Sequence, residues 1–375
     1  MNNWITRQIS ECADVMSGGT PSRAVADYWG SDYFWVTPTD ITGTKGSYLY
    51  ESKEKISEIG LKNSSAKLLP PGAILMTSRA TLGESKISKV PVCTNQGFKS
   101  LVVKDNVSNV FLRYSLLQNK SRYSSFGIGT TFLEVNKADT DRFQIYMPEL
   151  KSEQEKIAAI LMAIDEQIES TDKLIDKKKD IKKGLVQDLI YTKIHDKPIE
   201  NVVDILDNLR VPINDEERQR LGGNVPYYGA NGLQGFIDRP LFNEPLILMA
   251  EDGGNFEQFA SRPIAYRISG PSWVNNHAHI LRAKNYNQDY LFYVLEHMNI
   301  LSFISGGTRA KLNQGELRKI KVPSTDIKEQ ERISKLINLV VDEINDVSML
   351  KAKLTTQKQG LMQDLLTGRV RVKDV

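Results

Sequence analysis

The residues of this chain that are most able to do chemistry lie in short polar stretches, and one of them is His277-Ala278-His279. Two histidines separated by one residue on a strand point the same way, and imidazole is a common zinc ligand. No cysteine or further histidine lies nearby to complete a coordination set. We therefore favour a hydrogen-bonding pair that could face DNA over a metal site. The adjacent Asn275-Asn276 adds amide groups that could bond to bases or hold a loop.

Two glycine-rich polar stretches, residues 127–131 and 306–311, have a composition suited to phosphate. Glycine permits tight turns and a close approach of the backbone, while N–H groups, hydroxyls and neighbouring Arg or Lys side chains bind phosphate oxygens. Each stretch taken alone is equally typical of an ordinary turn. The recurrence of the pattern in both halves of the chain favours the phosphate-binding interpretation.

Thr77-Ser78-Arg79 and Glu251-Asp252 follow two hydrophobic runs that look equivalent, yet their chemistry differs. Arginine suits guanine, whereas a carboxylate can accept a hydrogen bond from cytosine. If the two runs belong to two similar domains, different loops after them would let each domain bind a different target. Each loop alone could equally be an ordinary surface loop. Lys177-Lys178-Lys179 and Lys182-Lys183 form a basic run, which indicates a solvated helix face or a contact with phosphates or an acidic partner.

Signatures of nucleotide and methyl-donor chemistry are missing from the sequence. It contains no Gly-x-x-x-x-Gly-Lys-Ser/Thr loop for nucleoside phosphates. It also lacks the Asn/Asp-Pro-Pro-Tyr/Phe motif of amino-methyltransferases, and its one Pro-Pro pair, Pro70-Pro71, does not fit that motif. Spacing alone leaves a nuclease cluster of carboxylates and lysine open, but nothing in the sequence points to one.

The elements that must position these polar groups occur twice in the sequence. Residues 152–191 match residues 328–367 at 13 of 40 positions without a gap, including the Glu-Gln-Glu that opens each segment. Weaker similarity joins residues 71–76 to residues 244–249 further upstream. Internal similarity of this kind indicates a duplication. The chain therefore reads as head, repeated segment, head, repeated segment.

The repeated segments are predicted to be long helices. Each lacks proline and begins after a proline-containing stretch, and Ser152 with Glu155 fits a capping box. Forty residues at about 1.5 Å each make a rod of roughly 60 Å. Apolar residues recur at steps of three and four, the pattern of a coiled-coil seam. The seam is predicted at Ile157, Leu161, Ile164, Ile168, Leu185, Ile333, Ile337, Val340, Ile344, Leu354 and Leu361.

Two such rods in one chain are expected to pair, because neither can bury its apolar stripe alone. If a pseudo-twofold axis relates the halves, the rods run antiparallel. The alternative, that they are core helices of one large domain, is disfavoured because most helices of globular proteins are far shorter. The heads show short β-type runs broken by Gly, Pro, Asn and Ser clusters, which predicts α/β domains with many loops.

The predicted fold class is α+β, with two α/β heads separated by two long helices that form an antiparallel coiled coil in a pseudo-twofold, circular arrangement. The predicted boundaries are residues 1–150 for the first head, 151–193 for the first helical region, 194–325 for the second head and 326–370 for the second helical region.

The bulk composition adds limits to this picture. The formal net charge is only +3, so nucleic-acid binding would depend on local basic patches. Two cysteines, Cys12 and Cys93, are too few for a disulfide framework or a zinc site, and we expect buried thiols in a reducing cytoplasm. The first residues lack the basic start and apolar core of a signal peptide. A soluble cytoplasmic protein is the expectation.

Longer motifs remain in both heads and at both ends. They are Gly18-Gly19-Thr20-Pro21-Ser22 with Tyr28-Trp29, Trp35-Val36-Thr37-Pro38, Pro226-Tyr227-Tyr228-Gly229-Ala230-Asn231-Gly232 and Leu361-Met362-Gln363-Asp364-Leu365-Leu366-Thr367-Gly368. With the repeated Glu-Gln-Glu, they cover nearly the whole chain. The chain resembles the specificity subunits of type I restriction-modification systems. The first head lacks the Tyr-Tyr-Gly-Ala-Asn-Gly signature, so the two heads are not expected to dock on DNA identically.

The resemblance implies two target recognition domains, each reading one half of a split site in double-stranded DNA, and helices that fix the spacing between the halves. It implies that methyltransferase subunits dock on the helices and methylate adenine with S-adenosylmethionine. A motor-nuclease subunit that uses ATP and magnesium would join for cleavage. This chain itself would bind no cofactor or metal and carry no catalytic residue. The roughly 60 Å rod exceeds one DNA turn, about 34 Å.

The DNA-contacting residues are expected among polar and aromatic groups of the loops: Ser78, Arg79, Asn95, Gln96, Lys99, Thr130, Thr131, Tyr227, Tyr228, Asn231, Asn276, His277, Thr308, Arg309 and Lys311. Two other function classes stay open. One is an enzyme with a hidden nuclease or methyltransferase site, and the other is a coiled-coil scaffold that does not bind DNA.

Overall fold

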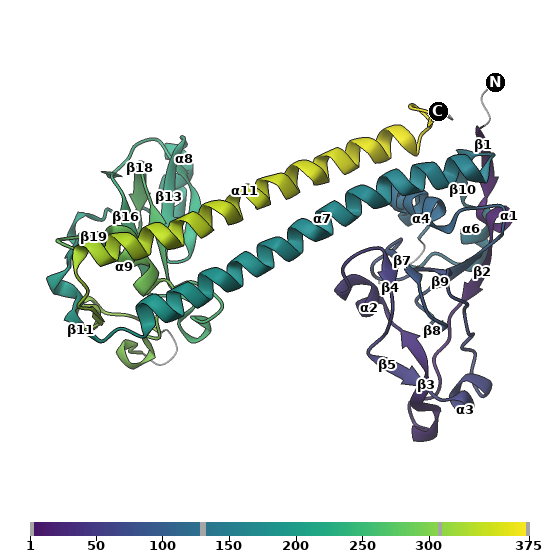
Figure 1. Cartoon of the computed structure of the whole chain (residues 1–375), viewed down its shortest axis with the longest axis horizontal. Helices are drawn as coiled ribbons and strands as arrows, with labels where there is room; N and C mark the ends of the chain where they lie inside the picture. Colours follow the sequence, from purple (N-terminus) through teal and green to yellow (C-terminus); the bar gives the residue numbers. More distant parts are fainter. Residues whose placement is uncertain (1–3, 128–132, 307–309, 373–375) are drawn as a thin grey trace. The chain divides into compact units, whose positions relative to one another are not determined.

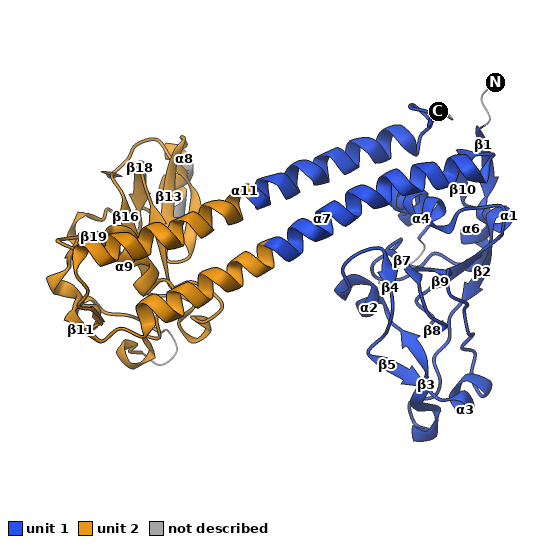
Figure 2. Ribbon diagram, viewed as in Figure 1, with its two compact units in different colours: residues 1–174, 347–375 blue, residues 175–346 orange. Residues whose placement is uncertain are grey.

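The computed structural model describes residues 4–127, 133–306 and 310–372. The chain forms two compact units, which Figure 2 colours separately. Unit 1 comprises residues 1–174 and 347–375, and unit 2 comprises residues 175–346. Each unit contains one head and a stretch of each long helix, so the predicted division into two α/β heads and two helices is confirmed. No helix of the described residues is long and apolar enough to cross a membrane.

The head of unit 1 is built from short strands and short helices (Figure 1). Its strands are β1 (Trp4–Gln8), β2 (Ala13–Ser17), β3 (Trp29–Val36), β4 (Tyr48–Leu49), β5 (Glu54–Ile56), β6 (Ile74–Met76), β7 (Ser85–Ser88), β8 (Val92–Thr94), β9 (Lys99–Val103) and β10 (Gln144–Pro148). Its helices are α1 (Ile9–Cys12), α2 (Pro38–Gly43), α3 (Glu58–Lys62), α4 (Asn109–Gln118), α5 (Lys120–Ser124) and α6 (Lys137–Arg142).

The head of unit 2 is built in the same way (Figure 1). Its strands are β11 (His195–Pro198), β12 (Val203–Ile205), β13 (Val225–Gly229), β14 (Gly232–Ile237), β15 (Phe242–Asn243), β16 (Leu246–Ala250), β17 (Ala265–Ile268), β18 (Pro271–Val274), β19 (Ala278–Ala283) and β20 (Lys321–Pro323). Its helices are α8 (Asp215–Leu221), α9 (Gln288–Leu295) and α10 (Gln314–Leu317).

The two heads share one sheet topology. The order β2-β9-β6-β7 in unit 1 matches β12-β19-β16-β17 in unit 2, and β5-β3-β8 matches β14-β13-β18. The pairs β3–β8 and β13–β18 are both parallel. At the centre, Ile74 pairs with Leu101 in unit 1, as Ile247 pairs with Leu281 in unit 2. The duplication read from the sequence therefore extends through both heads.

Continuous apolar runs form the central strands because these strands are buried on both faces. Every residue of β6 and of β16 is buried. The strands pack against helices α4 and α9 respectively, whose apolar residues belong to the same cores. Cys12 and Cys93 are buried free thiols, as expected, and burial raises the pKa of each to about 11.

Helix α7 (Lys151–Val186) and helix α11 (Ile327–Leu365) are the two predicted rods. A π-helical turn, Gln187–Tyr191, follows α7. The helices run antiparallel within each unit (Figure 1). In unit 1, Asp165 pairs with Lys358 and Asp172 with Lys351, both at 2.6 Å, so the order along α11 reverses that along α7. The predicted antiparallel pairing is confirmed.

The repeated Glu-Gln-Glu anchors each long helix through its middle residue. Gln154 accepts a hydrogen bond from the backbone N–H of Ser108 at 2.9 Å, and Gln330 accepts one from that of Asn287 at 2.8 Å. Ser108 and Asn287 are the N-caps of α4 and α9. The predicted capping box at Ser152 is wrong, because α7 already begins at Lys151 and Ser152 lies inside its first turn.

The predicted seam residues contribute to the cores of the heads as well as to the pairing of the helices. Ile157 and Leu161 are buried in the core of the unit 1 head, and Ile333 and Ile337 in that of unit 2. Ile164 and Leu354 are buried as well, while Ile168, Leu185, Val340, Ile344 and Leu361 are half-buried. The beginning of each helix is therefore a core element of its head. Leu185 and Leu361, near the other ends of the helices, also pack against these cores. The alternative that the helices are core elements of one large domain is not supported, because the chain forms two compact units.

Candidate nucleic-acid interface

Unit 1 gathers a set of charged side chains where strand β6 ends. The carboxylate of Glu134 accepts a hydrogen bond from Arg79 Nε at 2.7 Å and one from Lys99 Nζ at 3.2 Å. Lys99 Nζ also lies 3.3 Å from the hydroxyl of Ser78. The backbone closes the same junction, because Val135 N–H donates to the carbonyl of Ser78 at 3.1 Å. We call Ser78, Arg79, Lys99 and Glu134 the unit 1 clip.

The unit 1 clip is partly shielded from water. The Lys99 side chain is only 6% exposed, whereas those of Arg79 and Glu134 are 43% and 32% exposed. A buried ammonium group is costly unless a carboxylate and hydrogen-bond acceptors surround it. Burial would raise the pKa of Glu134, but the hydrogen bonds from Arg79 and Lys99 outweigh burial and lower it. Glu134 therefore stays ionised and holds both cations.

The backbone beside the unit 1 clip is strained. Ala80 has a φ of 57°, in the left-handed region that costs a residue with a side chain about 1–2 kcal/mol. Two contacts hold it there: the N–H of Thr81 donates to the carbonyl of Arg79 at 2.6 Å, and the Thr77 hydroxyl donates to the carbonyl of Thr81. Strain of this kind concentrates at functional sites.

Asn95 and Gln96 complete this face of unit 1. The Asn95 side chain accepts from the N–H of Gly97 at 2.9 Å, and Gln96 is exposed and accepts from the hydroxyl of Thr20. A side chain on Gly18 would place its Cβ 2.0 Å from the carbonyl oxygen of Asn95. The first glycine of the Gly-Gly-Thr motif is therefore required because the backbone passes too close to Asn95 for any side chain.

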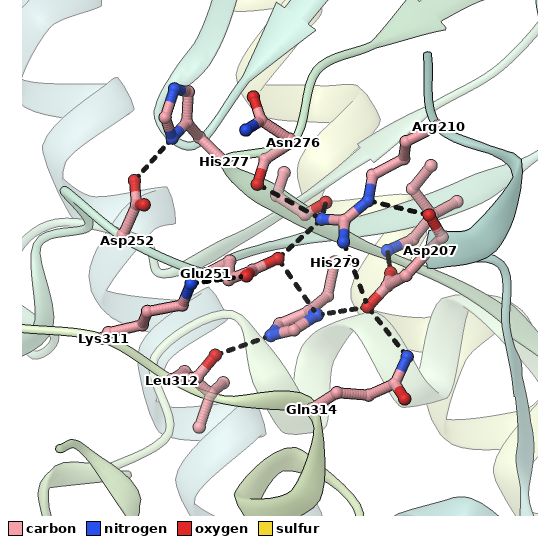
Figure 3. A network of polar contacts seen from close by, with 12 residues as sticks. Asp207, Arg210, Glu251, Asp252, Asn276, His277, His279, Lys311, Leu312 and Gln314 are labelled. Carbon is pink, nitrogen blue, oxygen red and sulfur yellow. Dashed lines mark hydrogen bonds and ion pairs between the residues drawn. The ribbon is translucent and has the colours of Figure 1, made fainter. Parts of the chain in front are cut away.

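Unit 2 builds its junction at the end of strand β16 from different residues (Figure 3). Glu251 accepts from Arg210 Nη1 at 2.6 Å and pairs with Lys311 Nζ at 3.0 Å. Asp207 approaches His279 Nδ1 at 2.6 Å and accepts from Gln314 at 3.1 Å. We call Asp207, Arg210, Glu251, His279 and Lys311 the unit 2 clip.

His279 lies at the centre of the unit 2 clip and is 1% exposed. Its Nδ1 faces the Asp207 carboxylate, and its Nε2 lies 2.8 Å from the carbonyl oxygen of Leu312. The ring is therefore held from both sides, by a carboxylate and by a backbone carbonyl. Burial would raise the pKa of Asp207, but its bonds to His279 and to the backbone outweigh burial and lower it.

The contacts of the unit 2 clip show whether His277 and His279 could bind one metal ion together. Carboxylate and imidazole atoms of Asp207, Glu251 and His279 lie within 4.8 Å of one another, a spacing that could hold a cation. Arg210 and Lys311 already supply positive charge to those carboxylates. His277 pairs instead with Asp252 at 2.7 Å, so the two histidines serve different carboxylates. The arrangement fits an ion-pair network better than a metal site.

The two clips occupy equivalent positions. Leu312 N–H donates to the carbonyl of Glu251 at 2.7 Å, just as Val135 N–H donates to Ser78. The N–H of Glu251 donates to the carbonyl of His277 at 2.9 Å, and the N–H of Ser78 to that of Gly97 at 2.7 Å. Glu251 therefore matches Ser78, His279 matches Lys99, and Lys311 matches Glu134. The carboxylate precedes α6 in unit 1 but follows the central strand in unit 2, while the backbone hydrogen bonds are the same.

The predicted contact residues divide by exposure. Gln96, Asn231 and Asn276 are exposed, and Arg79, Asn95, Tyr228, His277 and Lys311 are partly exposed. Ser78, Lys99 and Tyr227 are buried, so as placed here their side chains hold the fold and do not reach the surface. Thr130, Thr131, Thr308 and Arg309 lie outside the described residues. Which of the exposed residues contact bases stays a prediction.

Sequence reasoning missed Asp207, Arg210, Glu134 and Gln314. Asp207 and Arg210 lie far from the other unit 2 clip residues in sequence, and only the pairing of β12 with β19 brings them close. Glu134 had a usable signal, because it stands two residues before Asn136 as Lys311 stands two before Asn313. Their opposite charges hide the equivalence of Glu134 and Lys311 in the sequence.

A family model described as "Type I restriction modification DNA specificity domain" matches residues 1–178 and 193–354. The MjaIX specificity subunit of Methanocaldococcus jannaschii is 36% identical over 174 residues, which are 46% of this chain and 40% of that protein. A putative type I restriction enzyme specificity subunit of Haemophilus influenzae is 33% identical over 38% of this chain and 36% of its own length. These matches therefore span less than half of either relative.

Other comparisons cover the chain from end to end. The EcoprrI specificity subunit of Escherichia coli is 22% identical over 95% of this chain and 92% of its own. The crystal structure of the type I restriction-modification S subunit from M. genitalium has a TM-score of 0.64 and 16% identity, and covers 100% of this chain and 97% of that one. This last likeness shows the fold. With the family model matching both halves, the chain belongs to the type I restriction-modification DNA specificity family.

Proposed function

We propose that this chain is the subunit that selects the DNA target of a type I restriction-modification complex and that it has no catalytic site of its own. Each head reads one half of a bipartite site in double-stranded DNA. The antiparallel helices set the spacing between the halves and dock methyltransferase subunits. S-adenosylmethionine, ATP and magnesium are used by the methyltransferase and motor-nuclease partners in the cytoplasm.

The observation that carries this proposal is the contrast between frame and loops. Both heads keep the same strand order and the same backbone hydrogen bonds around the central strand. The side chains at the strand ends differ in type and in charge, with Arg79 in unit 1 and Asp252 at the matching place in unit 2. One frame with two sets of polar side chains is what two readers of different base sequences need.

The mechanism follows from the division of labour in DNA recognition. Lys and Arg side chains and backbone amides contact phosphates and set the register, whereas polar side chains at base edges specify the sequence. Exposed amides, such as those of Gln96 and Asn276, are suited to base edges. Because the net charge is only +3, phosphate contacts must come from local groups.

Methylation mapping tests the proposal. A host that carries this chain with its methyltransferase subunits should show one methylated motif made of two parts separated by unread bases. Replacing residues 1–150 with the head of a relative should change the letters of one part and leave the other intact. A motif that changes in both parts would contradict the assignment of one part to each head. Modification of DNA by the purified chain alone would contradict the absence of a catalytic site.

The spacing role has its own test. Deleting one heptad from each helix, residues 172–178 and residues 345–351, keeps the antiparallel pairs in register. The helices then lose about 10 Å, so the gap between the two half-sites should shorten by roughly three base pairs. The half-site letters should not change. An unchanged gap would show that something other than the helices sets the spacing.

A further inference from the structure

We infer that Glu134 of unit 1 and Glu251 of unit 2 are positioning residues. Each carboxylate ties the segment after the central strand to the segment before α6 or α10, and thereby fixes how its head presents base-reading side chains. The inference rests on the proposed function, because it concerns the half-site that each head reads. It adds a specificity role for two acidic residues that would themselves repel DNA.

The unit 1 clip joins three separate stretches of chain. Glu134 precedes α6, Arg79 follows β6 and Lys99 begins β9. Each oxygen of the Glu134 carboxylate has its own cation, Arg79 on Oε2 at 2.7 Å and Lys99 on Oε1 at 3.2 Å. Gln96 and Asn95 lie on the turn that leads into β9, so the stretch that ends at Lys99 carries candidate base contacts. Fixing Lys99 therefore fixes that turn.

The unit 2 clip performs the same joining with reversed polarity. Here the carboxylate, Glu251, follows the central strand, and the cation, Lys311, stands at the place of Glu134. Arg210 adds a second cation to Glu251 at 2.6 Å, and it also donates to the carbonyl of Ala278 at 2.9 Å, at the start of β19. The ion pair has persisted between the halves of the chain although its two ends have been exchanged. What both halves share is the bridge, and the identity of each residue is secondary.

Direct contact with DNA does not explain these carboxylates. A negative charge beside phosphates is repulsive. The Glu251 side chain is 13% exposed and that of Glu134 is 32% exposed, and both are already bonded to cations. The cations already bound to these carboxylates weaken them as acceptors for a base donor. Ala80, strained beside Arg79, is a further sign that the segment after β6 is held in a set conformation.

The substitution Glu134→Gln separates a positioning role from a purely electrostatic one, because the two roles predict changes in different quantities. One predicts a change in discrimination and the other a change in overall affinity. Removing a negative charge from a DNA-facing surface raises affinity for any DNA. If the carboxylate positions the loops, the same change lowers the discrimination between correct and altered letters by roughly tenfold in the half-site read by unit 1. The other half-site should be unaffected. The measurement uses the full chain assembled with its methyltransferase subunits, with methylation mapping in a host and competition binding with single-letter variants of the site.

A matched control and a conservative variant complete the design. Glu58→Gln makes the same chemical change in unit 1, on an exposed pair with Lys62 in α3, and should leave discrimination unchanged. Glu134→Asp keeps the carboxylate of the unit 1 clip and shortens its side chain by one carbon. This conservative variant should retain more discrimination than Glu134→Gln, because a charged acceptor for Arg79 and Lys99 remains. Thermal melting of each complex shows whether the fold has survived, and Glu251→Gln repeats the test on the other half-site if Glu134→Gln does not fold.

The outcomes distinguish the inference from the function on which it rests. If the wild-type complex methylates no two-part site, the proposed function fails. If the wild type does so and a folded Glu134→Gln complex keeps wild-type discrimination, or only binds all DNA more tightly, the positioning role is refuted. Relaxed letters confined to one half-site in Glu134→Gln, with discrimination better retained in Glu134→Asp, would support it.

Discussion

The two heads show how one backbone frame accepts opposite charge patterns. In unit 1 the central strand is followed by Ser78 and Arg79 and the bridging carboxylate is Glu134; in unit 2 it is followed by Glu251 and the bridging cation is Lys311. The backbone bonds around both junctions are the same. The sheet therefore determines which segments meet, whereas the side chains only have to supply a carboxylate and a cation between them.

The clips also differ in depth. Asp207 and His279 in unit 2 have side chains that are 6% and 1% exposed, whereas Arg79 and Glu134 in unit 1 face water in part. An unpaired charge strongly destabilises the fold when it is buried, whereas an exposed ion pair contributes little to stability. The network of unit 2 should therefore carry more of its unit's stability than the clip of unit 1. The predictions below test this contrast from the largest expected effect to the smallest.

The largest effect is expected for Asp207→Asn in unit 2. The change removes the carboxylate that lies 2.6 Å from His279 Nδ1, and it weakens the bonds to Gln314 and to the N–H of Ile280, which donates to Asp207 at 3.0 Å. We expect the unfolding free energy of unit 2 to fall by about 3 kcal/mol, since a buried partner is left uncompensated. Hydrogen exchange of β19 reports it, with β9 of unit 1 as the internal reference. A loss below about 1 kcal/mol would mean that the depth of the network has no consequence.

An equal effect in the two units is expected for Gln154→Ala and Gln330→Ala. Each glutamine is buried and bonds to an N-cap N–H, and each also donates to a backbone carbonyl, that of Pro148 at 2.9 Å or of Thr325 at 2.6 Å. Truncation leaves two backbone groups without partners, buried in unit 1 and partly buried in unit 2, which costs about 2 kcal/mol in either unit. Denaturant unfolding followed by hydrogen exchange in α4 and α9 measures both. If the losses of unfolding free energy in the two units differ by more than the loss in either unit, the two glutamines are not equivalent anchors.

A smaller difference is expected on acidification. The pKa values of Asp207 and Glu251 in unit 2 and of Glu134 in unit 1 are lowered, because bonds to cations outweigh burial. A carboxyl whose folded pKa is lowered stabilises the fold above its unfolded pKa, near 4, and this contribution is lost as the pH falls through the folded pKa. Unit 2 has two such buried groups, so it should lose protection from hydrogen exchange first as the pH falls below about 4. Loss of unit 1 first would contradict the contrast in depth.

The smallest effects are expected for ion pairs between the long helices. Lys178 pairs with Glu343 at 2.7 Å, but the Glu343 side chain is 58% exposed, so Glu343→Gln should cost about 0.5 kcal/mol or less. Asp165 of unit 1 pairs with Lys358 and also accepts from the Tyr114 hydroxyl at 2.6 Å. Asp165→Asn should therefore cost more, about 1 kcal/mol. Thermal melting of the two variants in parallel would show whether this order holds.

Much of the fold could be predicted because it is written in periodic and repeated patterns. The 13 matches between residues 152–191 and 328–367 revealed the duplication, and steps of three and four gave the helices. The antiparallel pairing followed from the duplication by symmetry. Periodicity could not show that Ile157 and Ile333 pack into the heads, because a stripe of apolar residues does not say what covers it.

The candidate site was predictable only in outline. The strand ends at Arg79 and Glu251 were found because they follow apolar runs that match between the halves. Ser78 and Lys99 were expected on the surface, yet they are buried, since a polar side chain can be satisfied inside by a carboxylate or a hydroxyl. Exposure depends on neighbours from distant strands, which no local spacing reveals.

By itself the sequence determined the duplication, the two long helices and the two strand-rich heads, because each of these depends on residue types at fixed intervals along the chain. Only the tertiary structure decided which charges meet. Asp207, Glu251, His279 and Lys311 come from four separate segments, and the pairing of β16 and β12 with β19 brings them together. The exchanged polarity of the two clips became visible only there, because an ion pair is defined by distance in space and not by order in the chain.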